Sequence, residues 1–149
     1  MLCFLLGIRE PEQVTRDPLV GGIFENLVVI ECPKARYNRG ETADLWFFRD
    51  SNGNEVDLAW REGGALAAAE IKSASTFSMG MLKGLGRFRR LVSRAAHGSP
   101  IYGGEPHGFS DGTRVRNFRG WRECLETRSE GGAWRRIASA MPKSDKADA

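Results

Sequence analysis

The sequence predicts a single α/β domain: a mixed sheet that opens with three antiparallel strands and is flanked by two long helices. Two segments carry apolar residues at helical spacing, residues 19–36 and 79–96, and three short apolar runs bounded by turn signals lie between them. The chain has 149 residues, of which 41% are hydrophobic and 28% charged, so it suits one soluble globular domain with a real core.

The first long helix is predicted to begin after Asp17-Pro18, because aspartate before proline is typical of a helix start. Pro33 lies inside the periodic pattern and would cost about 3 kcal/mol in a helix interior, so we expect the helix to kink or stop near Cys32. The apolar opening, residues 1–8, is too short to span a bilayer and lacks signal-peptide features. It is typical of a helix end, and a polar linker is expected after it.

Three strands follow in the sequence. Residues 45–49 form the first, Asn52-Gly53 predicts a hairpin turn, and the second strand covers residues 54–60. A Gly63-Gly64 turn leads to a third strand over residues 66–72. Its alanine run is more typical of a helix, but the bounding turns favour a strand.

The rest of the chain predicts smaller elements. Residues 100–102 form a fourth strand, residues 105–112 a loop and residues 114–118 a short edge strand, and residues 121–125 form a helical turn that packs on the core. From Thr127 the chain is polar, and we expect disorder there. The domain is therefore predicted over residues 1–126, with residues 1–17 as the remnant of a preceding segment and linker, and 127–149 as a tail.

Asp57, Glu70 and Lys72 are the residues most suggestive of chemistry. Because strand side chains alternate between faces, Val56, Leu58 and Trp60 are expected on one face and Asp57 on the other. Glu70 and Lys72 emerge together while Ile71 points oppositely, and antiparallel pairing could set Asp57 beside them.

Two carboxylates and an ammonium suit metal-assisted phosphodiester hydrolysis. Mg²⁺ takes oxygen ligands and often only one or two protein carboxylates, so Asp57 and Glu70 are candidate ligands and the Ile71 carbonyl a third. Lys72 could orient or deprotonate the attacking water, or offset charge on the phosphorane. The alternative is that these are ordinary charged residues on the strands.

A wider set of motifs resembles the PD-(D/E)XK nuclease-like superfamily. The resemblance is closest to the uncharacterised C-terminal domain that follows an AAA-type ATPase module in many bacterial and archaeal proteins, and it covers the first five-sixths of the chain. It lies in four motifs: Gly22-Ile23-Phe24-Glu25-Asn26-Leu27-Val28, Phe48-Arg49-Asp50, Gly53-Asn54-Glu55-Val56-Asp57 and Glu70-Ile71-Lys72-Ser73.

This resemblance implies a restriction-endonuclease-like fold, Mg²⁺ or Mn²⁺ as cofactor, DNA as substrate, and a role for Glu25 beside the metal, with a solvated or capping carboxylate as the alternative for Glu25. It also implies an ATPase partner, encoded elsewhere or once fused to this domain. The chain itself has no G-x-x-x-x-G-K-[ST] phosphate loop, so we do not expect it to hydrolyse ATP.

The second long helix carries a basic stripe opposite its apolar face. No acidic residue lies between positions 79 and 96, and the stripe comprises Lys83, Arg87, Arg90 and Arg94. Such a stripe could follow a DNA backbone without reading sequence, or could be a solvated helix face. The formal net charge of +3 alone is too small to indicate nucleic-acid binding.

Cysteine usage indicates a reducing compartment. Cys3, Cys32 and Cys124 are odd in number and far apart, which favours mostly buried thiols in a cytoplasmic protein. We expect no membrane association, because the apolar opening is too short to span a bilayer.

Two alternatives to a nuclease remain open from the sequence. One is a catalytically inactive module that keeps the fold for DNA or protein binding. The other is a truncated gene product, which Pro33, the abrupt apolar start and the alanine-rich third strand would fit.

Overall fold

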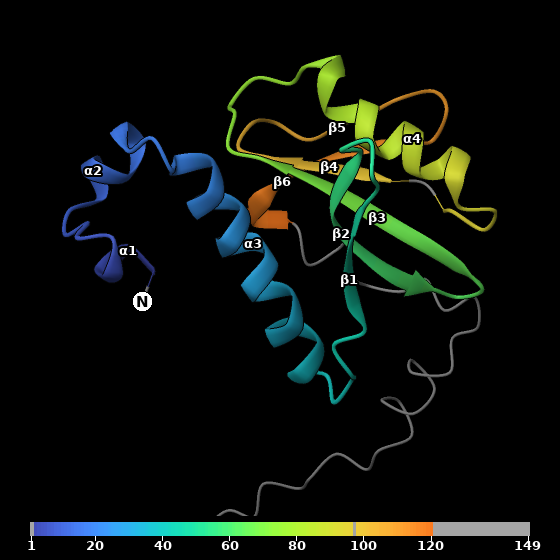
Figure 1. Cartoon of the computed structure of the whole chain (residues 1–149), viewed down its shortest axis with the longest axis horizontal. Coiled ribbons are helices and arrows are strands. Elements are labelled where there is room, and N and C mark those ends of the chain that lie inside the picture. The colour runs from blue at the N-terminus through green and yellow to red at the C-terminus, as the bar shows by residue number, and fades with distance from the viewer. Residues whose placement is uncertain (1, 97, 121–149) are drawn as a thin grey trace, which may run out of the picture.

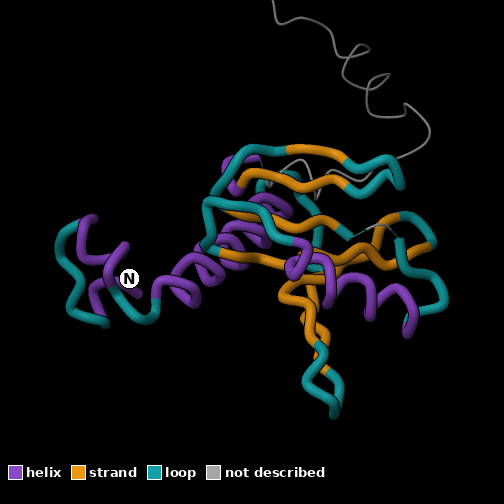
Figure 2. Tube along the Cα trace, turned by 90° about the horizontal axis from the view of Figure 1, so that it is seen from above, coloured by secondary structure: helices purple, strands orange, loops and turns teal. Residues whose placement is uncertain are grey.

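The computed structural model describes residues 2–96 and 98–120. Two short helices, α1 (Leu2–Leu5) and α2 (Pro11–Arg16), stand to one side of the sheet and lead into the long helix α3 (Val20–Tyr37), as Figures 1 and 2 show. α2 lies in the segment where a polar linker was expected. The Gln13 side-chain oxygen accepts a hydrogen bond from the Glu10 N–H at 2.9 Å, and this cap starts the helix.

Helix α3 begins where the sequence predicts it but does not stop at Pro33. An Asp17 carboxylate oxygen accepts a hydrogen bond from the N–H of Leu19, the residue just before the helix, at 2.8 Å. Of the two outcomes expected at Pro33, a kink or a stop, the stop is wrong, since α3 continues to Tyr37. Cys32 and Arg36 are 1% and 5% exposed. Burial of this last stretch against the sheet therefore offsets the backbone hydrogen bond that proline cannot make.

The sheet is mixed and has six strands in the order β1-β2-β3-β4-β6-β5. The strands are β1 (Leu45–Arg49), β2 (Glu55–Glu62), β3 (Ala65–Lys72), β4 (Ser99–Tyr102), β5 (His107–Gly108) and β6 (Arg114–Asn117). β1, β2 and β3 pair antiparallel, whereas β4 runs parallel to β3 and β6 parallel to β4.

This topology confirms the predicted α/β class and the three antiparallel strands at the start. Two details differ. β5 forms inside the segment that was expected to be a loop, and it pairs antiparallel with β6. β6, expected at the edge, therefore lies between β4 and β5.

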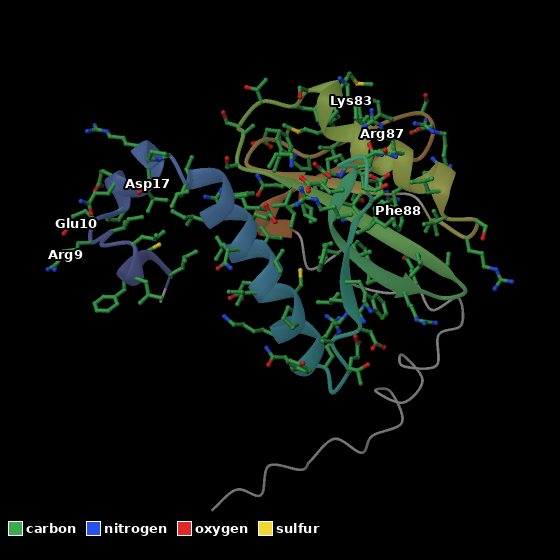
Figure 3. All side chains as sticks on the ribbon, in the orientation of Figure 1. Arg9, Glu10, Asp17, Lys83, Arg87 and Phe88 are labelled. Atoms are coloured by element: carbon green, nitrogen blue, oxygen red, sulfur yellow. The ribbon has the colours of Figure 1, made fainter. Side chains whose placement is uncertain are left out.

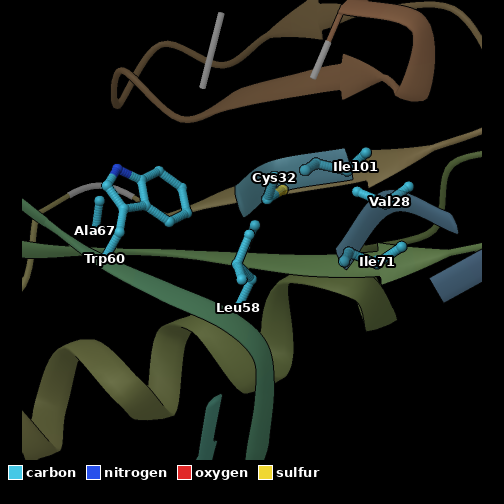
Figure 4. Packing of buried hydrophobic residues seen from close by; sticks show 8 residues of the cluster. Val28, Cys32, Leu58, Trp60, Ala67, Ile71 and Ile101 are labelled. Carbon is cyan, nitrogen blue, oxygen red and sulfur yellow. The ribbon is translucent and has the colours of Figure 1, made fainter. Parts of the chain in front are cut away.

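Helices α3 and α4 (Lys83–Leu91) cover opposite faces of the central strand β3. Ala67, Ala69 and Ile71 pack on the α3 side, in the cluster drawn in Figure 4, where the α4 ribbon lies beyond the strands. Ala68 packs on the other side against Leu85 of α4. All three alanines are at most 1% exposed. Small side chains let both helices approach the strand closely, which is the packing reason for alanine in a strand.

A β-bulge interrupts β2 at the candidate site. The pairing of β1 with β2 changes register between two Cα pairs, Trp46 with Ala59 and Phe48 with Val56. Between these pairs, Asp57 and Leu58 of β2 lie opposite Phe47 alone. A bulge of this kind bends the strand and re-aims its side chains.

The bulge corrects one expectation from strand alternation. Leu58 and Trp60 pack with α3, as residues of one face should. Val56, expected on that same face, packs instead with Ala59 against α4. Because the bulge adds one residue to β2, the side chains that precede it in the strand lie on the opposite face from the one that simple alternation predicts.

The second long helix is shorter than the apolar pattern predicts. A 3₁₀ turn, η1 (Met79–Leu82), precedes α4, and Val92 is already extended. Beyond the helix, Leu66 of β3 donates its N–H to the Arg94 carbonyl at 2.8 Å and accepts from the Ala96 N–H at 2.7 Å. These sheet-like bonds replace helical ones, so Arg94 does not belong to the helix. Within the described residues, no helix is long and apolar enough to cross a membrane.

Arg36 is a buried cation whose Nε and Nη2 atoms have no hydrogen-bond partner among the residues that the structure describes. An unsatisfied buried polar group costs about 1–3 kcal/mol, so we expect Arg36→Met to raise the free energy of unfolding by about that amount. Urea denaturation measures it, with Arg16→Met at the exposed end of α2 as control. A loss of stability in Arg36→Met would contradict the expectation and show that the guanidinium is satisfied in solution.

Candidate functional site

The candidate site lies where β2 and β3 separate. Their Cα pairing ends at Leu58 with Ala69. Just beyond that pair, an Asp57 carboxylate oxygen accepts a hydrogen bond from the Ile71 N–H at 2.6 Å. In a regular antiparallel pair, the Ile71 N–H would bond to a backbone carbonyl of β2. Here the Asp57 side chain accepts that hydrogen bond instead, at the point where the bulge bends β2, and the bond holds the Asp57 carboxylate against β3.

Lys72 joins the two carboxylates. Its Nζ lies 2.7 Å from Glu70 Oε1 and 3.6 Å from Asp57 Oδ2. The Asp57 and Glu70 side chains are only 8% and 11% exposed, whereas that of Lys72 is 43% exposed. The three side chains that the sequence expects together therefore do lie together, with the two carboxylates mostly buried and the ammonium partly exposed.

One carboxylate oxygen of this group has no partner. Glu70 Oε2 is buried and makes no hydrogen bond within residues 2–96 and 98–120, although Oε1 contacts Lys72. Buried acceptors are nearly always satisfied by protein, water or an ion. The unpaired oxygen is therefore the atom at which this site is most suited to take a cation, a water or a proton.

Burial and mutual charge shift the pKa values here. Burial raises the pKa of Glu70, and the negative charge of Asp57 adds to this, while the hydrogen bond from Lys72 opposes it. For Lys72, burial alone would lower the pKa, but the hydrogen bond to Glu70 and the charge of Asp57 outweigh it and raise the pKa. The site holds its ammonium in the charged form.

Glu25 on α3 shares the electrostatic field of this group. Burial raises its pKa, and the charge of Asp57 raises it further. One turn earlier, a Cβ added to Gly21 would lie 4.0 Å from Ser73 Oγ, so the start of α3 lies beside the end of β3. Among residues 2–96 and 98–120, however, no three His, Cys, Asp or Glu side chains are grouped as metal ligands. Glu25 therefore does not join Asp57 and Glu70 in such a group.

The sequence matches a known protein family. The family model DUF4143, described as a domain of unknown function, matches residues 20–117, more than half of the chain. The chain belongs to the DUF4143 family. Domains of this family are often found after AAA ATPase modules. No curated protein and no solved structure matches the chain. The matched region runs from α3 to β6 and contains the whole candidate site.

The basic stripe of the DUF4143 domain is reduced to Lys83, Arg87 and Arg90, which share one side of α4. Arg94 lies outside the helix. Arg87 also has a structural role that the pattern did not reveal, because its Nη1 donates to the side-chain oxygen of Asn54. Asn54 in turn donates to an Asp50 carboxylate oxygen at 2.6 Å. This chain of bonds ties α4 to the β1–β2 turn.

Glu31, Cys32 and Cys3 lie outside the candidate site. Glu31 forms an ion pair with Lys34 at 2.6 Å and is a structural acid. Cys32 is buried, as expected, and Cys3 is half-buried. The expected helical turn over residues 121–125, the polar tail and Cys124 lie outside the described residues.

Gly84 is a site residue that sequence reasoning missed. A Cβ added there would lie 2.6 Å from the Glu55 carbonyl oxygen and 3.0 Å from Glu70 Oε2. Only glycine allows α4 to approach the carboxylates this closely. The available signal was a glycine inside an amphipathic helix, where it costs about 1 kcal/mol relative to alanine.

Gly84→Ala is therefore expected to destabilise the DUF4143 domain by about 1–3 kcal/mol, the usual cost of overpacking. Gly86→Ala is the matched control, because a Cβ there meets nothing within 4 Å. That control should gain up to about 1 kcal/mol from helix propensity. Urea denaturation of both variants measures the difference, and equal stability changes would show that the close approach does not exist.

Proposed function

We propose that this DUF4143 domain is a Mg²⁺-dependent nuclease module that hydrolyses DNA phosphodiesters. One observation carries the proposal. Two almost fully buried carboxylates, Asp57 and Glu70, converge on the ammonium of Lys72 where two strands separate, and one Glu70 oxygen has no partner. Burying charge in this way is unfavourable, and such clusters are common at functional sites.

The donor set fits a hard divalent cation. Among the described residues, Glu70 Oε2 has no hydrogen-bond partner, and Asp57 makes its hydrogen bond to the Ile71 N–H and its ion pair with Lys72 through Oδ2. Mg²⁺ commonly takes one or two carboxylates and completes its octahedron with water and substrate phosphate. Asp57 and Glu70 would hold the ion, with the Ile71 carbonyl as a third ligand. A bound Mg²⁺ supplies polarisation of the phosphoryl oxygen and a more acidic water.

The side chains around the two carboxylates have separate roles in the proposed reaction. Lys72, whose ammonium lies beside both carboxylates, would offset charge on the phosphorane or orient the attacking water. Glu25, whose pKa is raised by burial and by Asp57, assists the metal shell through water. Lys83, Arg87 and Arg90 on α4 hold the DNA backbone without reading its sequence.

A cleavage assay tests this proposal. The purified chain is incubated with labelled duplex, single-stranded and branched DNA in Mg²⁺ or Mn²⁺. Wild type and Glu12→Ala, a control at an exposed acid on α2, should cleave at least one substrate, whereas Asp57→Ala and an EDTA sample should not. No cleavage of any substrate by wild type would overturn the nuclease assignment.

A second candidate is a catalytically inactive DNA- or protein-binding module. The contact of Lys72 with both carboxylates favours it, because an ammonium already neutralises part of their charge without a metal. In that case the domain serves an AAA-type ATPase, fused or encoded elsewhere, and its stability and binding do not respond to Mn²⁺.

A further inference from the structure

A shallow depression crosses the outer side of η1 and α4. Its volume is about 350 Å³, within the range of small-ligand sites. Six residues line it: Met79, Leu82, Lys83, Gly86, Arg87 and Arg90. Three of them are apolar or lack a side chain, and three are cationic. The depression is thus neither a plain basic surface nor a plain apolar one.

The apolar part of the lining is open to solvent. Met79 is 64% exposed, Leu82 is partly exposed, and the Cα of Gly86 faces open space. Methionine makes favourable contacts with aromatic rings through its polarisable sulfur. A flat aromatic group is therefore a suitable occupant of this part of the surface.

The other part of the lining consists of three cationic side chains. Arg87 is held by its bond to Asn54, and Figure 3 shows Lys83 and Arg87 along α4. In the part of the chain that the structure describes, neither Lys83 nor Arg90 forms a salt bridge. The helix offers no acid to neutralise them, since residues 79–96 contain none. An anionic group would find unpaired positive charge here.

We propose that this depression binds an unpaired nucleotide, with its base on Met79, Leu82 and Gly86 and its phosphate between Lys83 and Arg90. This rests on the proposed function and narrows its substrate class to single-stranded or branched DNA. Duplex DNA presents mainly phosphates to such a surface and keeps its bases stacked, so it would leave the apolar part unfilled. Lys83 is next to Gly84, which approaches Glu70, so the Lys83 end of the depression and the carboxylates lie at the same end of α4.

Fluorescence anisotropy in EDTA tests the proposal without cleavage. The probes are a labelled single strand, its duplex, and an abasic strand of equal length and charge. Wild type should bind the single strand about tenfold more tightly than either control, a difference of about 1.4 kcal/mol in binding free energy. Equal affinity for all three probes, or no binding at all, would overturn it.

Matched variants separate base contact from charge. Met79→Ser should remove the preference for the single strand and leave the abasic affinity unchanged. Leu91→Ser, at the end of α4 with 59% exposure but outside the depression, should change nothing. Arg90→Ala should weaken all three complexes and lower the salt slope by about one. If Met79→Ser and Leu91→Ser behave alike, the base site does not exist.

Two further outcomes bear on the proposal and keep it distinct from the nuclease assignment. Equally tight binding to phosphatidylserine vesicles, lost in Met79→Ser, would overturn the nucleotide site in favour of a membrane surface. Cleavage of DNA without any single-strand preference would remove this inference and leave the nuclease assignment standing. A single-strand preference without cleavage would do the reverse.

Discussion

Lys72→Met is expected to lower the single-turnover rate of DNA cleavage by about 100-fold or more, the usual effect of removing one preorganised charge from a transition state. Its ammonium lies 2.7 Å from Glu70 and 3.6 Å from Asp57. The charge that it neutralises grows in the transition state, so the rate should fall while the Kd for DNA changes little.

Two matched variants distinguish an effect on the cleavage rate from an effect on DNA binding. Lys83→Met removes a cation of the same type from α4 and should weaken DNA binding without changing the rate at saturating protein. Lys72→Arg keeps the charge with a different shape and should recover part of the rate. If Lys72→Met changed only the Kd for DNA, Lys72 would be a binding residue and its proposed role in the chemical step would be wrong.

Glu70→Gln is expected to stabilise the fold and to remove divalent-ion binding together. The pKa of Glu70 is raised, first by burial, although Lys72 donates a hydrogen bond to it. The ionised carboxylate is therefore less favourable in the folded chain than in the unfolded one. A neutral amide of the same shape avoids this penalty, so the melting temperature of Glu70→Gln should exceed that of wild type by several degrees at neutral pH.

The pH dependence of this gain follows from the direction of the shift. A carboxyl with a raised folded pKa destabilises the fold above that pKa, and the penalty disappears as pH falls below its ordinary value of 4.5. The advantage of Glu70→Gln should thus be largest at neutral pH and vanish in acid. Thermal melts at several pH values measure it, with the exposed Glu12→Gln as control. A destabilised Glu70→Gln would mean that the ion pair with Lys72 outweighs burial.

Local signals predicted most of the fold because each is decided within a few residues. Asn52-Gly53 and Gly63-Gly64 indicated the turns, and alternation put Glu70 and Lys72 on one side with Ile71 on the other. The third strand was predicted from its boundaries against the helix propensity of alanine. The structure supplies the reason, because α3 and α4 press on both faces of Ala67 and Ala68.

The features that the sequence did not reveal depend on contacts between distant segments. The bulge at Asp57 exists only in the pairing of β2 with β1, so alternation misplaced Val56. Pro33 stays within α3 because that turn is buried on the sheet. Arg94 is not part of the basic stripe, because its carbonyl accepts a hydrogen bond from Leu66 of β3 and the residue lies beyond the helix. The need for glycine at position 84 came only from its approach to Glu70.

Calorimetric titration with Mn²⁺ tests the central claim most directly, because it asks whether the converging carboxylates hold a divalent ion, independently of any substrate. Wild type is expected to bind one Mn²⁺ per chain, and Asp57→Asn and Glu70→Gln to lose that binding while remaining folded by circular dichroism. A wild-type protein that binds no Mn²⁺, or binds it equally well after Asp57→Asn, would contradict the assignment of Asp57 and Glu70 as a metal site.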